Sequence, residues 1–162
     1  QMAAEMGLPF SFAHFFGLAV EQGPMIAQMY RDQFKPSKYL SEPKVNIGLQ
    51  VLCAETEEEA LRLASSRNVA RVKSVQGMRE AVPPVDEALA YQFRPDERAY
   101  INQLQEHYID GDPQQVKEKI EAVAEMYKTD DVGIVTICYA FEDRMRSYEL
   151  VAEAFGLEGI NQ

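Results

Sequence analysis

The sequence has few of the residues that build metal sites and disulfide frameworks. Its 162 residues include two cysteines, two histidines and no tryptophan. Two isolated cysteines do not make a disulfide scaffold, which favours a reduced, cytoplasmic protein. His14 and His107 are far apart and lie in no His/Cys cluster, so we expect no metal site. A nucleophile elbow, a phosphate loop and a dinucleotide fingerprint are also missing from the sequence.

Positive charge is scarce as well. The chain has 16 Lys and Arg against 26 Asp and Glu, which gives a net charge of −10. Such a surface repels phosphate backbones and anionic lipids, so we expect neither a nucleic-acid nor a membrane partner. No apolar run approaches the roughly 20 residues of a bilayer span, and no basic segment precedes an apolar stretch as in a signal peptide.

Buried strands alternate with amphipathic helices along the chain. Apolar residues make up 46% of the sequence, enough for a core, and the length suits one domain covering residues 1–162. This order predicts an α/β fold with about three parallel strands in right-handed βαβ units and flanking helices. So thin a sheet has two open edges, which predicts pairing with another copy or with a further segment of the chain. The expected strands are 9–15, 44–54 and 131–139.

Capping residues set the expected helix limits. Thr56 and Glu59 have the spacing of a capping box, in which each side chain bonds the other's backbone amide. Asp112 and Pro113 suit the start of a later helix, and Gly156 suits the end of the last one. Helices are expected at about 24–34, 56–72, 86–91, 95–108, 113–127 and 142–155, with a turn from residue 17 to 24 and a long connection from 74 to 95.

The first residues already have a helical pattern, and Gly7 suits the cap that ends it. A chain that begins inside a helix is expected to be a piece of a longer protein. The alternative is a short opening helix with a frayed end.

His14 is the first candidate for a functional side chain. It lies near the carboxyl end of the first expected strand, among several phenylalanines. Ligands of parallel α/β proteins gather at the carboxyl ends of strands, where an imidazole can stack on or hydrogen-bond to a planar ligand. The alternative is a core histidine bonded to a backbone carbonyl. Cys53 and Cys138 come late in two neighbouring strands, where they could approach each other. The simpler interpretation is two small buried hydrophobic residues.

Five stretches, in order, resemble one known family, the bacterial luciferase-like monooxygenases. Each stretch alone is a weak signal, but together they extend over nearly the whole chain. The matches are residues 1–15 with A-A-x-x-G-L-P-[FY]-x-F-A-x-H-F, 30–37 with Y-R-x-x-F-x-P-S, 53–60 with A-[DE]-T-x-x-E-A, 111–116 with G-[TSD]-P-x-x-V, and 146–152 with R-S-[YF]-x-L-[LIV]-A.

The resemblance implies a (β/α)8 TIM barrel that uses reduced FMN, or the deazaflavin F420, with oxygen and a small organic substrate. The matched motifs belong to the carboxyl-terminal half of that barrel. A complete barrel needs about 250 residues, so the resemblance implies a partial barrel, with most of the flavin pocket and its phosphate-binding turn outside these residues. Of the flavin-facing positions it retains Ala13, His14 and Phe15. It identifies no catalytic residue.

Three functions remain open from the sequence. The first is a fragment of a flavin-dependent monooxygenase that is inactive and binds no flavin by itself. The second is a non-catalytic half-barrel that self-associates or binds a partner, consistent with the expected homo-oligomer. The third is a small enzyme with a degraded flavin site.

Overall fold

The computed structural model describes residues 1–15 and 20–157. They form two compact units, Gln1–Leu49 with Ile120–Val135, and Gln50–Lys119 with Thr136–Gln162. Strand β2 and helix α6 pass from one unit to the other. The single domain expected from the sequence stays a prediction, as do the partners at the sheet edges. Part of the expected turn after the first strand, residues 16–19, lies outside the described residues.

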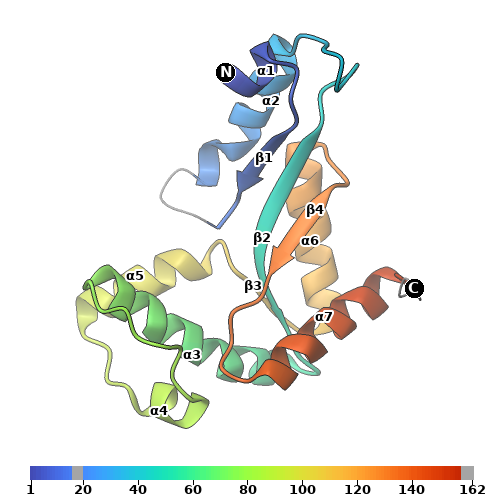
Figure 1. Cartoon of the computed structure of the whole chain (residues 1–162). Helices are drawn as coiled ribbons and strands as arrows, with labels where there is room; N and C mark the ends of the chain where they lie inside the picture. Colours follow the sequence, from blue (N-terminus) through green and yellow to red (C-terminus); the bar gives the residue numbers. More distant parts are fainter. Residues whose placement is uncertain (16–19, 158–162) are drawn as a thin grey trace. The chain divides into compact units, whose positions relative to one another are not determined.

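The first unit is built around a parallel strand pair. Strand β1 runs beside the first residues of β2, with Phe10 opposite Val45 and Ala13 opposite Gly48 (Figure 1). The Ile47 amide of β2 donates to the carbonyl of Asp131, just before β4. The elements of this unit are α1 (Met2–Glu5), β1 (Phe10–Ala13), the 3₁₀ helix η1 (Val20–Gln22), α2 (Gly23–Gln33), β4 (Val132–Val135), the start of β2 (Val45–Cys53) and the end of α6 (Pro113–Tyr127).

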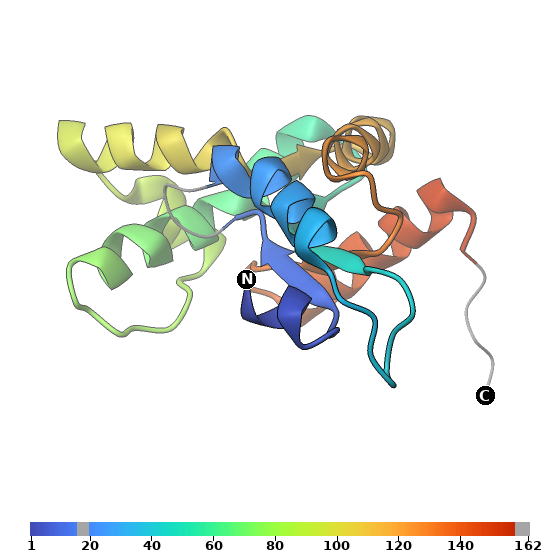
Figure 2. The ribbon, with the colours of Figure 1, turned by 90° about the horizontal axis from the view of Figure 1, so that it is seen from above.

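Helix α2 packs against β1, and α1 contacts α2 (Figure 2). Tyr30 of α2 is buried, and its hydroxyl donates to the Leu8 carbonyl at 2.8 Å. Gly7 has a φ of +62°, and a Cβ there would lie 2.5 Å from the Ser37 Cβ. Both the backbone conformation and the close approach of Ser37 require glycine, which confirms Gly7 as the residue that ends α1.

The second unit contains the rest of β2 and a set of helices around it. Strand β2 is fully buried from Leu49 to Cys53, as its apolar carboxyl half predicts. One hydrophobic cluster of this unit consists of the buried residues Leu52, Ala54, Ala60, Leu63 and Ala64, with Val85 and Cys138 packed against them. The other elements of this unit are α3 (Glu57–Val75), α4 (Val85–Ala90), α5 (Pro95–Gln105), β3 (Ile109–Gly111), the start of α6, and α7 (Phe141–Phe155).

Strand β3 was not predicted. The expected helix from residue 95 ends at Gln105, and Ile109–Gly111 then pairs in parallel with Val51–Cys53 of β2. The sequence Asp110-Gly111-Asp112 is typical of a turn, but here it supplies partners for the end of a buried strand. Two expected strands are also shorter than predicted, because β1 ends at Ala13 and β4 ends at Val135.

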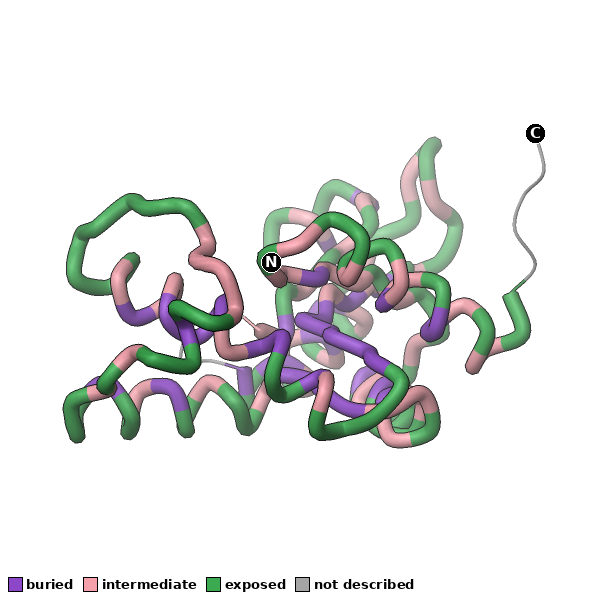
Figure 3. The backbone as a smooth tube through the Cα atoms, turned by 90° about the horizontal axis from the view of Figure 1, so that it is seen from below, coloured by how far each residue is buried: buried purple, intermediate pink, exposed green. Residues whose placement is uncertain are grey.

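Half of the predicted capping box at α3 is wrong. The Thr56 hydroxyl accepts from the Glu59 amide at 3.2 Å, as predicted, but the Glu59 carboxylate pairs with Arg62. The reciprocal arrangement occurs at α6, where Asp112 Oδ1 accepts from the Gln115 amide and Gln115 Oε1 accepts from the Asp112 amide. The connection from α3 to α4 is mostly exposed, and such exposed residues are green in Figure 3. No helix of the described residues has the length and apolarity to cross a membrane.

Candidate functional site

His14 lies directly after β1 and is held by two bonds of the first unit. Its amide donates to the Gly48 carbonyl at 2.8 Å, so the parallel ladder continues to this residue. Its side chain is buried, with Nδ1 2.8 Å from the Tyr127 hydroxyl and the two rings edge to face at 5.3 Å. One partner of the imidazole is therefore a hydroxyl group of α6. A bond from this histidine to a backbone carbonyl stays a prediction.

Tyr127 is the residue of this cluster that the sequence did not identify. Burial raises its pKa above the usual value, so the hydroxyl stays protonated and can hydrogen-bond the imidazole. The Phe12 ring packs on it at 5.7 Å, and a Cβ on Gly23 would overlap its hydroxyl. Glycine at position 23 thus leaves the space into which Tyr127 reaches toward His14. Only its apolar place on α6 was visible in the sequence.

Ala13 lies on the other face of β1. Phe10 and Phe12 are half-buried while Ser11 and Ala13 are exposed, as strand alternation requires. Ala13 is in register with Gly48, where a Cβ would still lie 3.5 Å from the Phe15 ring. The structure therefore brings Ala13 and Phe15 close to Gly48 and separates both from the side chain of His14.

A polar row crosses this exposed face one step earlier in the strands. Ser11 Oγ donates to Asn46 Oδ1 at 2.8 Å, and Asn46 Nδ2 donates to Asp131 Oδ1 at 2.8 Å. The face therefore combines satisfied polar groups with the small residues Ala13 and Gly48. Neither Ala13 nor Gly48 carries a large side chain, and the Phe15 ring lies within van der Waals contact of the place where a Gly48 side chain would begin.

The two cysteines do not offer a nucleophile. Burial, with the carboxylates of Asp112 and Glu55 as further causes, raises the pKa of the Cys53 thiol to about 11. Burial also raises the pKa of Cys138. Thiolates are rare at neutral pH under these conditions. Within residues 1–15 and 20–157, no three His, Cys, Asp or Glu side chains gather as a metal site.

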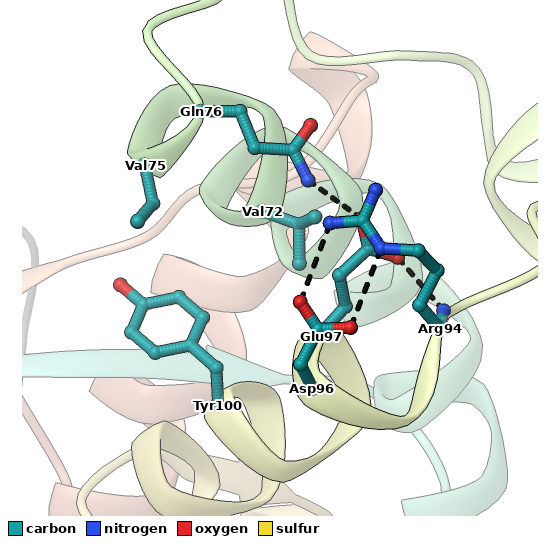
Figure 4. Close-up of a pocket in the computed structure, with 7 residues that line it drawn as sticks. All are labelled: Val72, Val75, Gln76, Arg94, Asp96, Glu97 and Tyr100. Carbon is teal, nitrogen blue, oxygen red and sulfur yellow. Dashed lines mark hydrogen bonds and ion pairs between the residues drawn. The ribbon is translucent and has the colours of Figure 1, made fainter.

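A separate cavity of about 110 Å³ lies in the second unit, between the end of α3 and the start of α5 (Figure 4). The buried Glu97 carboxylate there accepts from the Arg94 amide and from Gln76 Nε2, at 2.8 and 2.6 Å. These bonds, the backbone amide of Arg94 first, lower the pKa of Glu97. The Glu97 carboxylate is therefore occupied as the capping group of α5.

The chain is similar to curated proteins of about twice its length. The uncharacterized protein YwcH of Bacillus subtilis (strain 168) is 36% identical over 155 residues, which are 95% of this chain and 46% of that protein. A luciferase-like monooxygenase of Escherichia coli (strain K12) is 26% identical over 153 residues, 94% of this chain and 45% of that protein. The chain thus spans about half the length of these relatives. No protein-family model matches it.

Solved structures resemble it over a similar share. Apo-MsnO8 is 30% identical with a TM-score of 0.84, over 96% of this chain and 47% of the other. The oxygenating constituent of 3,6-diketocamphane monooxygenase from Pseudomonas putida, a type II Baeyer–Villiger monooxygenase in complex with FMN, is 18% identical with a TM-score of 0.55, over 94% and 43%. At that identity the likeness shows the fold alone. Together with the parallel strands and flanking helices, these matches confirm the predicted fold class, a partial (β/α)8 barrel.

Proposed function

The chain belongs to the luciferase-like monooxygenase family, and we propose that it is the carboxyl-terminal half of a flavin-dependent member that oxidises a small organic substrate with oxygen. The similarity to the luciferase-like monooxygenase of Escherichia coli and to apo-MsnO8 supports this assignment. Reduced flavin would supply the electrons for the reaction with oxygen. Because the chain spans about half of its relatives, the activity is proposed for the full-length protein, and this half alone is expected to be inactive and to bind no flavin.

The exposed face at the carboxyl end of β1 is the observation that carries the proposal. Ala13 and Gly48 face each other in register without large side chains, and Phe15 adds an aromatic ring beside them. These residues fit a flat isoalloxazine ring that packs against the backbone. Ala13, His14 and Phe15 are therefore the proposed flavin-binding residues. Ala13 and Phe15 would contact the ring, and the buried bond from His14 to Tyr127 would hold the strand end in place.

FMN is the proposed cofactor, and F420 is the alternative. The FMN complex of the 3,6-diketocamphane enzyme supports a fold of this kind as an FMN carrier. Parallel barrels form their sites from several strand ends, so residues of the other half would complete the pocket. We also propose a homo-oligomer in the cytoplasm, with flavin and a small substrate as ligands.

The test is FMN binding and flavin-dependent oxygen use by the full-length protein. We expect Ala13→Leu to weaken the binding of reduced FMN at least about tenfold, because the larger side chain occupies the ring's place. Ala90→Leu, on an exposed residue at the end of α4, is the matched control. Equal FMN affinity of Ala13→Leu and the control would refute the proposed flavin position.

A different result would refute the proposed monooxygenase function as a whole. A full-length protein that neither binds FMN or F420 nor consumes oxygen with the reduced flavin is not a flavin monooxygenase. If the 162-residue chain by itself then forms a stable dimer in size-exclusion chromatography with light scattering, the non-catalytic, self-associating half-barrel is the better description.

A further inference from the structure

Three consecutive residues of α7 bond the chain where strands β2 and β4 end. The Ser147 hydroxyl accepts from the Cys53 amide at 2.9 Å, and both residues are buried. The Tyr148 hydroxyl accepts from the Thr136 amide at 3.3 Å. Arg146 donates to Glu55 Oε1 through two nitrogens, at 2.9 and 2.8 Å. Segment 146–148 begins the R-S-[YF]-x-L-[LIV]-A motif, and the sequence resemblance implies no role for these three side chains.

The Ser147 hydroxyl accepts the hydrogen bond that the Cys53 amide would otherwise donate to a carbonyl of a neighbouring strand. At the end of β2, the next amide, Ala54, donates to the Gly111 carbonyl of β3 at 3.1 Å. Successive amides of a strand point to opposite edges, so the Cys53 amide points away from β3. Cys53 is 1% exposed, and a buried amide without a partner is costly. The side chain of Ser147 supplies that partner.

Tyr148 has the corresponding role after β4. This strand ends at Val135, and the amide of the next residue, Thr136, is bonded by the Tyr148 hydroxyl. Thr136 is 4% exposed, so its backbone position matters for the packing around it. A single turn of α7 thus fixes the backbone at two strand ends that are distant in the sequence.

Arg146 adds a charged contact on the outside of the same turn. Besides Glu55, its guanidinium lies within 3.3 Å of Glu149 and 3.2 Å of Glu153. The Glu55 side chain is 64% exposed, so this contact contributes little energy in water. The bonds of the Ser147 and Tyr148 hydroxyls to the backbone amides of Cys53 and Thr136 are therefore expected to contribute more than the Arg146 contacts.

The geometry points to Ser147 and Tyr148 as positioning residues of the flavin-dependent reaction, which hold the backbone directly at the end of β2 and directly after β4 within the second unit. The inference rests on the proposed function, because sites of parallel barrels are formed at the carboxyl ends of their strands. Neither residue is proposed to contact flavin or substrate. They act through the backbone of Cys53 and Thr136.

The experiment compares Ser147→Ala and Tyr148→Phe in the full-length protein. Each variant removes one hydroxyl and leaves the rest of the side chain in place. We expect the dissociation constant of reduced FMN, or the KM for oxygen consumption, to rise about three- to tenfold, as the loss of one such bond predicts. Amide exchange should accelerate at Cys53 in Ser147→Ala and at Thr136 in Tyr148→Phe. Ser147→Thr, which keeps a hydroxyl, should stay within about twofold of the wild type.

The controls are Ser65→Ala and Tyr39→Phe. The Ser65 hydroxyl bonds only a carbonyl of its own helix among the described contacts, and Tyr39 is 67% exposed. Faster amide exchange with unchanged FMN binding and KM would reduce segment 146–148 to a purely structural role and overturn the inference. Unchanged exchange would overturn it too, because the bonds would not limit opening. A wild-type protein without FMN binding overturns the proposed function and the positioning role together, and it is recognised without any variant.

Discussion

The buried ion pair between α3 and β3 gives the sharpest stability prediction. Arg67 Nη1 and Nη2 bond Asp110 Oδ1 and Oδ2 at 2.8 and 2.7 Å, and the Arg67 guanidinium lies 4.3 Å over the Tyr108 ring. The side chains of the pair are 0% and 6% exposed. Asp110→Ala leaves a buried guanidinium without its carboxylate. Removal of one partner of a buried pair costs about 3–5 kcal/mol.

A loss of this size is easy to measure. For a chain of 150–250 residues, each kcal/mol lowers Tm by about 2–4 °C, so Asp110→Ala should lower it by about 6–20 °C. The assay is thermal and urea unfolding followed by circular dichroism. Asp96→Ala is the control, because the Asp96 and Arg94 side chains are 72% and 61% exposed with a contact of 3.3 Å. Exposed pairs of this kind contribute at most about 1 kcal/mol.

A double substitution tests whether the loss of stability in Asp110→Ala comes from an unpaired buried charge. Arg67→Met combined with Asp110→Leu removes both charges, and replacement of a buried pair by apolar residues is often neutral. We therefore expect the double variant to be more stable than Asp110→Ala alone. A loss for Asp110→Ala no larger than that for Asp96→Ala would refute the reasoning, because the charge would then be solvated or paired elsewhere.

Two further predictions concern the first unit. Gly7→Ala should lower the free energy of unfolding by at least about 1 kcal/mol in urea, because a φ of +62° is strained for alanine and the Cβ overlaps Ser37; an unchanged midpoint would contradict the conformation of this cap. Tyr127→Phe removes the bond to His14, and it also removes a pH effect, because burial raises the pKa of Tyr127 above its unfolded value. The wild type should therefore lose stability as pH rises above about 10, with the loss smaller in Tyr127→Phe; parallel pH profiles of the two unfolding free energies would contradict this.

Local patterns predicted β2 and the helix ends well. Val45, Ile47 and Leu49 are buried in alternation, and Thr56 caps α3 with its hydroxyl. Such signals lie within a few residues of one another, so the sequence contains them completely. The strand β3 is different. Its Asp110 suits a turn locally, and it is buried only because Arg67, 43 residues earlier, neutralises it.

For the candidate site, the sequence predicts that Ala13, His14 and Phe15 lie near the end of β1, but it does not predict their contacts. The alternation of β1 predicts that Ala13 and His14 point to opposite faces, but the sequence does not contain the register that places Gly48 opposite Ala13. Tyr127 is 113 residues from His14, and its hydroxyl reaches the imidazole only because residue 23 is glycine. Such contacts depend on the packing of α6 against β1 and have no local signature.

Segment 146–148 shows how a motif and its physical role differ. A strand that extends beyond its neighbour has an amide at its end without a backbone partner. At Cys53 this buried amide donates to the side chain of Ser147, 94 residues away. The donor is fixed by where the strand ends, so a hydroxyl is needed at one position of α7 and apolar residues would not replace it. Ser147 is therefore needed because β2 ends at Cys53, whose amide has no strand partner there. We expect its hydroxyl to hold this strand end in place in the full-length protein.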